Sequence, residues 1–248
     1  MLKDNFSTQA ALYAKFRPKY PEEIYDFVLS KVKSFDTAWD CATGNGQVAY
    51  RLSETFKDVF ATDISQKQLD NAQQADNIHY TIAQAEKTDF QANTFDLITV
   101  GQAIHWFDFE RFYQEVRRVA KPDAIFAAWG YGTLTIDNVE ANVLFQDFYQ
   151  EQIGEYWDAE RGYIDDEYRT LPFTLAEIES PRFAMSYQWT LAELEGYLNT
   201  WSSVQKYIKI HHENPVDGFI ESLKAIYKSS DTFTVNFPIF MKVGRIEK

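Results

Sequence analysis

The chain has 248 residues, of which 45% are hydrophobic, so it can bury one substantial core, and two independent domains are not expected. Its formal charge of −13 repels polyphosphate backbones and anionic membrane surfaces, and the sequence shows no basic patch that would override this field. One cysteine cannot form an internal disulfide, the amino terminus has no apolar signal core, and no run approaches the roughly 20 apolar residues of a membrane span. We therefore expect a cytoplasmic, soluble protein with neither nucleic acid nor membrane as a partner.

The amino-terminal half shows alternating strand and helix patterns. Two prolines, Pro18 and Pro21, favour an extended stretch before a helix from about Pro21 to Ser34. The expected strands are Thr37 to Cys41, Val59 to Asp63, Ile78 to Ile82, Phe95 to Val100 and Ala124 to Gly130, and the expected helices between them are Gln47 to Phe56, Ser65 to Ala75 and Asp108 to Ala120. This alternation predicts an α/β fold with a doubly wound, mostly parallel sheet and a ligand site at the carboxyl ends of its strands.

The pattern changes after Gly130, where aromatic residues are scattered among acidic ones up to Pro181. This composition indicates a helical insertion or lid. A strand is expected at residues 183–189, followed by a helix to about Trp201 that Thr190 and Glu193 cap, and a further helix is expected from Pro215 to about Lys228.

The chain ends in two β-rich runs, residues 232–237 and 239–243, and Pro238 between them favours an edge position or a bulge. We predict a single domain over residues 1–248. Residues 1–130 form the core, 131–230 a helical cap and acceptor region with the strand at 183–189, and 231–248 an antiparallel C-terminal segment that completes a seven-stranded sheet.

The segment from Asp40 to Gln47 is the most informative part of the chain, because it places a glycine turn between a strand and a helix. Gly44 and Gly46 permit backbone conformations and close approaches that a Cβ would block, and the following helix directs N–H groups at the turn. Asp63 ends the next strand, where a carboxylate meets a ribose diol in Rossmann-type units. A nucleotide-like cofactor is therefore expected.

The glycines alone do not separate a nicotinamide enzyme from a methyltransferase, because Gly44 to Ala49 also fits the dinucleotide pattern. Asp40, four residues before Gly44, would repel a pyrophosphate and attract a cationic ligand. Ala85 and Glu86 are placed to line an adenine slot. After the strand that ends at Val100, residues 101–108 bring amide, imidazole and indole groups to the sheet edge.

With these features the chain resembles the class I S-adenosylmethionine-dependent methyltransferases, in particular the small-molecule branch with trans-aconitate methyltransferase-like proteins. The likeness covers nearly the whole chain. It is carried by Phe6-Ser7, Tyr13, Arg17-Pro18-Lys19-Tyr20-Pro21, the glycine turn, Asp63, Ala85-Glu86, Gln102 to Phe107, Leu198 to Ser202 and Phe237-Pro238-Ile239. Ala42 departs from the pattern, since the family often has its first glycine there.

The resemblance implies roles in binding S-adenosyl-L-methionine and the product S-adenosyl-L-homocysteine. Asp40 would engage the methionine ammonium, Asp63 the ribose hydroxyls and Glu86 the adenine edge or a neighbouring backbone group. Tyr13 and Arg17 would close over the cofactor, and Arg17 would pair either the cofactor's carboxylate or an acidic acceptor. The full set of expected cofactor residues is Tyr13, Arg17, Asp40, Ala42, Gly44, Gly46, Asp63, Ile64, Gln68, Ala85, Glu86, Gln102 and Ala103. No metal is expected.

Several alternatives stay open for the acceptor side. His105 can be a structural imidazole, a substrate hydrogen-bonding group or a catalytic base. Trp106, Trp157 and Trp201 can contact substrate or simply pack in the core. We expect a monomer or homodimer that methylates a small-molecule acceptor, with a carboxylate as the favoured acceptor group. A nicotinamide-dependent reductase and a non-catalytic protein that binds S-adenosylmethionine are the competing interpretations.

Overall fold

A computed structural model of the chain describes residue 16 and residues 18–248. The predicted cofactor residues Tyr13 and Arg17 lie outside these described residues.

The described residues form one mixed sheet of nine strands in the order β3-β2-β1-β4-β5-β9-β6, with β7 and β8 also paired to β9. The strands are β1 (Thr37–Cys41), β2 (Asp58–Asp63), β3 (Ile78–Ile82), β4 (Phe95–Gly101), β5 (Ala120–Tyr131), β6 (Thr135–Ile136), β7 (Ala176–Ile178), β8 (Phe183–Trp189) and β9 (Phe233–Arg245). Strands β1 to β5 are parallel, and β9 pairs antiparallel with β5. The predicted mostly parallel sheet with an antiparallel C-terminal strand is confirmed, and the short β6 and β7 bring the count to nine.

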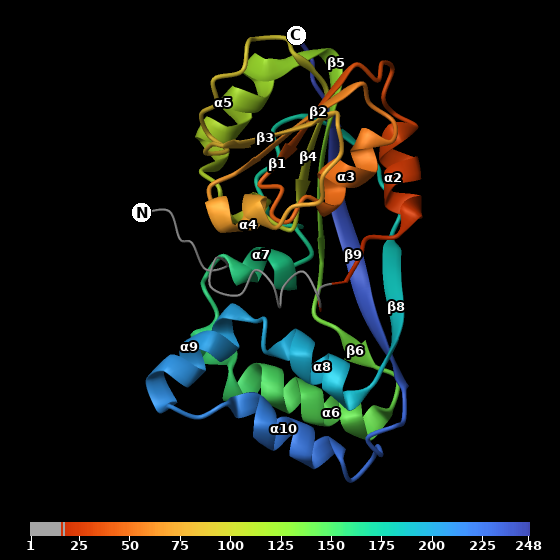
Figure 1. Cartoon of the computed structure of the whole chain (residues 1–248), viewed down its shortest axis with the longest axis vertical. Helices are drawn as coiled ribbons and strands as arrows, with labels where there is room; N and C mark the ends of the chain where they lie inside the picture. Colours follow the sequence, from red (N-terminus) through yellow and green to blue (C-terminus); the bar gives the residue numbers. More distant parts are fainter. Residues whose placement is uncertain (1–15, 17) are drawn as a thin grey trace.

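Helices cover both faces of the parallel strands (Figure 1). They are α2 (Glu22–Leu29), α3 (Gln47–Ser53), α4 (Gln66–Asp70), α5 (Phe109–Val119), α6 (Val139–Asp147), α7 (Arg161–Asp165), α8 (Leu191–Leu198), α9 (Ser202–His211) and α10 (Pro215–Leu223), with short turns η2 (Ile104–Trp106), η3 (Phe148–Gln152) and η4 (Gly154–Tyr156). Adjacent residues of β4 face opposite cores: Leu97 packs with α2 and α3, and Ile98 packs with α5. This two-faced burial explains why β4 is apolar throughout.

The helix after β2 is shorter than predicted, because α4 ends at Asp70 and not near Ala75. The residues that follow are bonded to their surroundings: Gln73 N–H donates to the Asn45 carbonyl at 3.1 Å, and Tyr80 donates its hydroxyl proton to the Gln73 carbonyl. These long-range bonds connect the segment to the glycine turn and to β3, so it leaves the helical path.

The two C-terminal runs form one continuous strand, β9, so the expected interruption at Pro238 is not observed. Pro238 lies where β5 has ended at Tyr131 and β6 has not begun, and there its carbonyl accepts from Gly132 N–H at 2.9 Å. The missing N–H of proline is tolerated at such a gap between partner strands.

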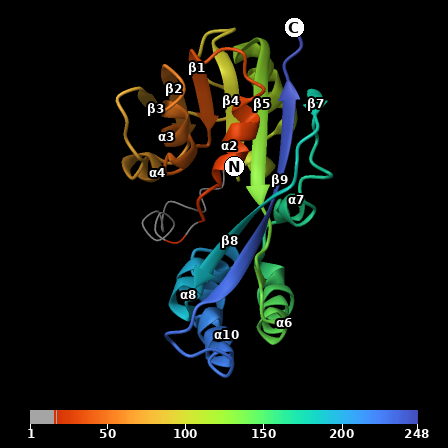
Figure 2. The same ribbon diagram turned by 90° about the vertical axis from the view of Figure 1, so that its right-hand side faces the viewer.

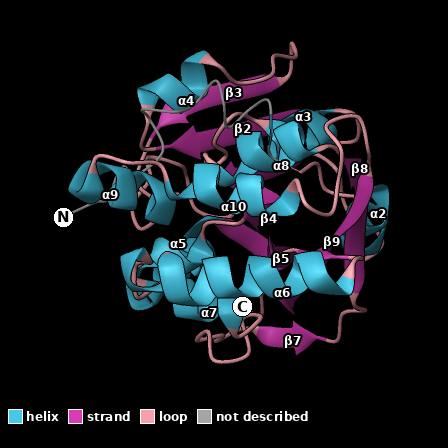
Figure 3. Ribbon diagram, turned by 90° about the horizontal axis from the view of Figure 1, so that it is seen from below, coloured by secondary structure: helices cyan, strands magenta, loops and turns pink. Residues whose placement is uncertain are grey.

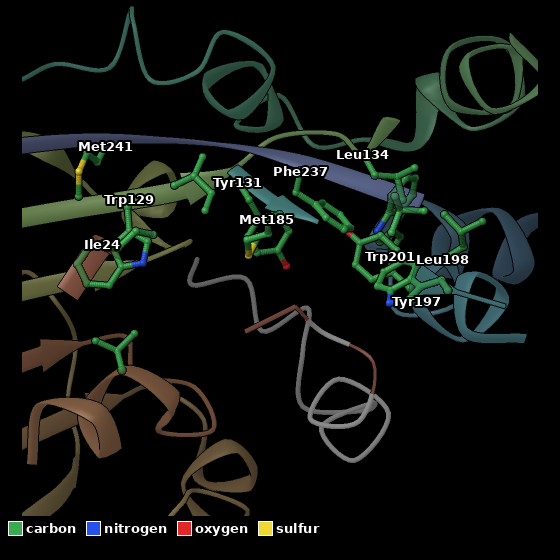
Figure 4. Packing of buried hydrophobic residues seen from close by; sticks show 14 of the residues in the cluster. Ile24, Trp129, Tyr131, Leu134, Met185, Tyr197, Leu198, Trp201, Phe237 and Met241 are labelled. Atoms are coloured by element: carbon green, nitrogen blue, oxygen red, sulfur yellow. The ribbon is translucent and has the colours of Figure 1, made fainter. Parts of the chain in front are cut away.

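Helices α6, α8, α9 and α10 form a cap beyond the carboxyl ends of the parallel strands, toward which the β5 arrow points in Figure 2. Seen from below, the cap helices lie across the end of the sheet (Figure 3). The predicted capping box at the start of α8 is confirmed, because Thr190 and Glu193 each accept from the other's backbone N–H. Strand β9 runs from the cap into the core, and one apolar cluster follows it from Tyr197 and Trp201 to Trp129 and Met241 (Figure 4).

Candidate functional site

A cavity of about 680 Å³ opens at the carboxyl ends of β1, β2 and β4. Its walls include most of the predicted cofactor residues within the described chain: Asp40, Ala42, Gly44, Asp63, Ile64, Gln68, Ala85, Glu86, Gln102 and Ala103. The sheet therefore brings these residues together from four separate parts of the sequence. Gly46 is the exception.

The turn after β1 contains three residues with positive φ: Ala42 at 54°, Gly44 at 56° and Gly46 at 76°. A Cβ added to Gly44 would meet nothing within 4 Å, so this glycine presents its backbone to open space at the cavity. A Cβ on Gly46 would instead collide with the Tyr80 side chain. Gly46 thus serves close packing at the start of α3 and does not line the cavity.

Asp40 is buried, with 1% of its surface exposed, and its carboxylate organises the turn. Oδ2 accepts from the Thr43 hydroxyl at 2.5 Å and from Ala49 N–H at 3.1 Å, while Oδ1 accepts from the Thr99 hydroxyl at 2.8 Å. Burial raises the pKa of the Asp40 carboxyl to about 6, against the lowering effect of these hydrogen bonds. The group is therefore an anion at neutral pH at the floor of the cavity.

Asp63 ends β2 and connects two neighbouring segments. Its Oδ2 accepts from Gly44 N–H and its Oδ1 from Ser65 N–H, both at 2.9 Å. The Ser65 hydroxyl in turn accepts from Gln68 N–H at 3.4 Å at the start of α4. The carboxylate thus holds the glycine turn and the α4 start beside the cavity.

Gln68, which belongs to α4, forms part of the cavity wall together with Ile64, Ala85 and Glu86. Gln68 is 4% exposed, and its Oε1 has no hydrogen-bond partner among the described residues. Ile64 and the buried Ala85 add apolar surface, and Glu86 accepts from Asp108 N–H at 3.0 Å. This Glu86 contact is with a neighbouring backbone group, one of its two predicted partners. An unpaired acceptor beside apolar surface suits a ligand with an N–H donor on a flat ring.

Gln102 follows β4, and its side chain binds the protein's own backbone. The amide donates to the Tyr131 carbonyl at 3.1 Å and accepts from Tyr131 N–H at 2.8 Å, so it mimics one rung of a β-ladder. Its φ of 56° is required for this geometry. Gln102 therefore holds the end of β4 against β5 and lines the cavity together with Ala103 and Tyr131.

His105 does not line the cavity. It is 6% exposed, and its Nδ1 lies 3.2 Å from the Tyr168 hydroxyl. Burial, and secondly the charge of Arg161, lowers the pKa of His105 to about 3, so the imidazole is neutral at physiological pH. These contacts correspond to the structural alternative for His105, although its bond is to a side chain and not to the backbone, and a group with so low a pKa is a poor general base. Its neighbour Trp106 does line the cavity.

Trp157 and Trp201 belong to an aromatic cluster in the cap. Their ring centroids are 5.3 Å apart, and Tyr149 lies 5.7 and 5.8 Å from them. Neither tryptophan is among the residues that line the 680 Å³ cavity. Their contact with substrate stays a prediction.

The charge of the cavity wall is predominantly negative. Among the residues that the structure describes, five carboxylates line it, from Asp40, Asp63, Glu86, Asp108 and Glu160, against the two cationic side chains of Lys19 and Arg111. Asp108 and Arg111, at the start of α5, and Glu160, before α7, are wall residues that the sequence analysis did not assign. A wall of this charge favours a cationic ligand over a pyrophosphate.

Comparisons with known proteins agree with this geometry. A family model described as "Methyltransferase domain" matches residues 39–128. A candidate methyltransferase of Dictyostelium discoideum is 34% identical over 251 residues, which cover 98% of this chain and 95% of that relative. The chain belongs to the class I S-adenosylmethionine-dependent methyltransferases.

Two further relatives extend this result. The solved structure of a candidate type II methyltransferase from Anaeromyxobacter dehalogenans superimposes with a TM-score of 0.85 at 33% identity, and the match covers 94% of this chain and 99% of that one. A probable S-adenosylmethionine-dependent methyltransferase of Saccharomyces cerevisiae, CRG1, is 23% identical over 96% of this methyltransferase and 93% of its own length.

Family membership implies binding of S-adenosylmethionine and its homocysteine product, which removes support from the nicotinamide-dependent reductase. Within residues 16 and 18–248, no group of three or more histidine, cysteine or acidic side chains is placed to hold a metal ion. The helices of that same part of the chain are too short or too polar to cross a membrane.

Proposed function

We propose that this methyltransferase transfers the methyl group of S-adenosylmethionine to a small-molecule acceptor, with a carboxylate oxygen as the favoured acceptor atom. The observation that carries the proposal is the acidic cavity at the carboxyl ends of β1, β2 and β4, where the open backbone face of Gly44 lies beside the Asp63 carboxylate. The finer choice of a carboxylate rests on the resemblance to the trans-aconitate methyltransferase-like branch.

The donor set of the cavity fits the cofactor. Asp63 would accept from the ribose hydroxyls, and the apolar surface of Ile64 and Ala85 would contact the adenine ring, with the unpaired Gln68 Oε1 available to an adenine N–H. Asp40 would attract the methionine ammonium, directly or through water, from its buried position. When bound, S-adenosylmethionine supplies a methyl group on a positively charged sulfur.

The protein's own contribution is alignment. Holding two reactants in attack geometry is worth roughly 7 to 11 kcal/mol, whereas a positioned base typically adds about 10² to 10⁴ in rate. A carboxylate acceptor is already ionised at pH 7 and needs no base, which agrees with a neutral, buried His105 outside the cavity. Gln102 and Tyr131 fix the wall next to the end of β4, and Trp106 adds an aromatic face, which favours a cation.

Calorimetric titration with S-adenosylhomocysteine tests the cofactor assignment. Micromolar or tighter binding is expected, with no comparable response to NADPH. A screen of small-molecule fractions with methyl-labelled S-adenosylmethionine then tests transfer. Cofactor binding without transfer to any fraction would favour the alternative of a non-catalytic S-adenosylmethionine-binding protein. The monomeric or homodimeric state, the division into core and cap, and the cytoplasmic location stay predictions.

A further inference from the structure

Arg161, the first residue of α7, has its side chain largely inside the cap, with 17% of it exposed. Its Nε donates to the Tyr149 hydroxyl at 3.0 Å and to Asp165 Oδ1 at 3.2 Å, and its Nη2 donates to the Thr133 hydroxyl at 2.9 Å. The guanidinium carbon also lies 4.6 Å from the centre of the Trp157 ring. Three polar partners and one aromatic face therefore fix the plane of the guanidinium.

These contacts use only part of the hydrogen-bonding capacity of Arg161. A guanidinium has five N–H donors, and both donors on Nη1 and one on Nη2 have no partner among residues 16 and 18–248. Asp165 Oδ1 also accepts from the Tyr149 hydroxyl at 2.7 Å, and Asp165 is 45% exposed, so its ion pair with Arg161 Nε is shared and is weakened by solvent. Three of the five donors are therefore left for solvent or a ligand, and an anionic oxygen group is the ligand that a guanidinium binds most strongly.

Arg161 does not itself line the 680 Å³ cavity, but its neighbours in sequence and in packing do. The preceding residue, Glu160, lines the cavity, and Thr133 is two residues beyond Tyr131, which also lines it. Helix α7 contacts η2, whose last residue, Trp106, forms part of the same wall. A small acceptor placed against this wall can therefore extend one end toward Arg161.

We propose that Arg161 binds an anionic oxygen group of the methyl acceptor through Nη1 and Nη2, and so selects acidic acceptors over neutral ones. The two nitrogens present parallel N–H groups, which match the two oxygens of a carboxylate. Lys19 and Arg111 are the cationic side chains among the described wall residues, and the five wall carboxylates outnumber them. The inference rests on the proposed methyl transfer and adds the residue that recognises the acceptor.

The experiment uses the full chain and methyl-labelled S-adenosylmethionine. A cell extract of small molecules is first separated by anion exchange into retained and unretained fractions, and each fraction is then incubated with the protein. We expect label in the retained, anionic fraction. Arg161→Gln should lower this labelling at least tenfold with unchanged affinity for S-adenosylhomocysteine, and Arg161→Lys should recover only part of it, because an ammonium lacks the planar fork. Arg169→Gln is the matched control, since Arg169 is 67% exposed and pairs with Asp166.

Asp165→Asn gives a readout that a merely structural Arg161 would not produce. Removal of the competing carboxylate should increase labelling of the anionic fraction at low acceptor concentration about two- to fivefold. This test does not depend on whether Arg161→Gln folds. Label confined to the unretained fraction, undiminished labelling by folded Arg161→Gln, or a loss in Lys19→Gln in place of Arg161→Gln would each overturn the inference. Failure to bind S-adenosylhomocysteine, or binding without label in either fraction, would overturn the proposed function itself.

Discussion

The Asp63 carboxylate accepts a hydrogen bond from the Gly44 amide at 2.9 Å, which joins the end of β2 to the glycine turn after β1. The residue proposed to bind the ribose therefore also shapes the turn that receives the rest of the cofactor. Its second oxygen accepts from Ser65 N–H, so both oxygens of the carboxylate are held in position for the cofactor.

Asp63→Ala should weaken S-adenosylhomocysteine binding by about 1.5 to 3 kcal/mol, the scale of hydrogen bonds to a charged group. The two lost backbone contacts should also reduce the free energy of unfolding by about 1 to 2 kcal/mol. Calorimetry and denaturant unfolding measure the two effects. Asp58→Ala is the control, because Asp58 lies at the opposite end of β2 and forms an exposed pair with His79. Unchanged affinity in Asp63→Ala would refute the ribose assignment.

The buried Asp40 should make cofactor binding pH-dependent. Its pKa of about 6 means that about a tenth of the carboxyl is ionised at pH 5 and nearly all of it at pH 7.5. If the ionised form attracts the ammonium of S-adenosylhomocysteine, affinity should fall about tenfold between pH 7.5 and pH 5. Asp40→Asn should show weaker binding and a flat profile over this range. An unchanged pH profile in Asp40→Asn would exclude Asp40 as its source.

Asp40 also affects stability with a definite sign. Because the pKa of Asp40 in the folded state is raised above 3.8, the protonated form favours folding. This contribution to the free energy of unfolding is fully present below pH 3.8 and is lost as pH rises through 6. The difference in unfolding free energy between wild type and Asp40→Asn should therefore change over that window.

His105 should show the opposite dependence. Its pKa is lowered from 6.5 to about 3 by burial and then by Arg161, so the folded protein favours the neutral imidazole. This contribution to stability is present above pH 6.5 and is lost as pH falls toward 3. His105→Phe should remove this pH dependence and cost about 1 to 3 kcal/mol, because the buried Tyr168 hydroxyl loses its partner.

Turnover by a folded His105→Phe variant distinguishes a structural from a catalytic imidazole. We expect rates within a few-fold of wild type and no change in S-adenosylhomocysteine affinity. A loss of 10² or more in rate at unchanged cofactor affinity would instead give His105 a chemical role. Tyr168→Phe is the companion variant, since it removes the same hydrogen bond from the other side.

Alanine should be less favourable than glycine at position 42, because the backbone there has a positive φ. Its φ of 54° lies in the left-handed region, which costs a residue with a Cβ about 1 to 2 kcal/mol, and glycine avoids this cost at the price of a more flexible unfolded chain. Ala42→Gly should therefore be neutral to about 1 kcal/mol stabilising, whereas Ala38→Gly, at a buried extended position of β1, should destabilise. Thermal unfolding measures both. Strong destabilisation by Ala42→Gly would contradict the role of the positive φ.

The sequence was most informative where local patterns decide the structure. The glycine turn, Asp63 at a strand end and the Thr190 cap of α8 each depend on a few neighbouring residues, and the structure places each as expected. Contacts between residues far apart in the chain were harder to predict from the sequence. The hydrogen bonds of Thr133 and Tyr149 to Arg161 depend on how the cap folds over the sheet, so no spacing in the sequence predicts them.

Gln102 shows the same limit within the site. The sequence predicted that Gln102 follows the fourth strand and belongs to the cofactor site, but it did not show that the amide binds both backbone groups of Tyr131, 29 residues away in the chain. A positive φ at a glutamine, which turns the side chain toward β5, has no signature in composition or periodicity. Only the pairing of β4 with β5 creates the position that the amide fills.

Gln102→Glu tests the two hydrogen bonds between Gln102 and Tyr131, because it keeps the acceptor for Tyr131 N–H and removes the donor to the Tyr131 carbonyl. The free energy of unfolding should fall by about 1 to 3 kcal/mol, since a partly buried carbonyl loses its partner and faces a carboxylate. Turnover should fall more than cofactor affinity, because Tyr131 forms the cavity wall beyond the end of β4. Gln84→Glu adds the same charge at another wall residue and should leave the β4 to β5 pairing intact. If both variants lose stability and turnover equally, the effect comes from the added charge and not from the lost hydrogen bond between Gln102 and Tyr131.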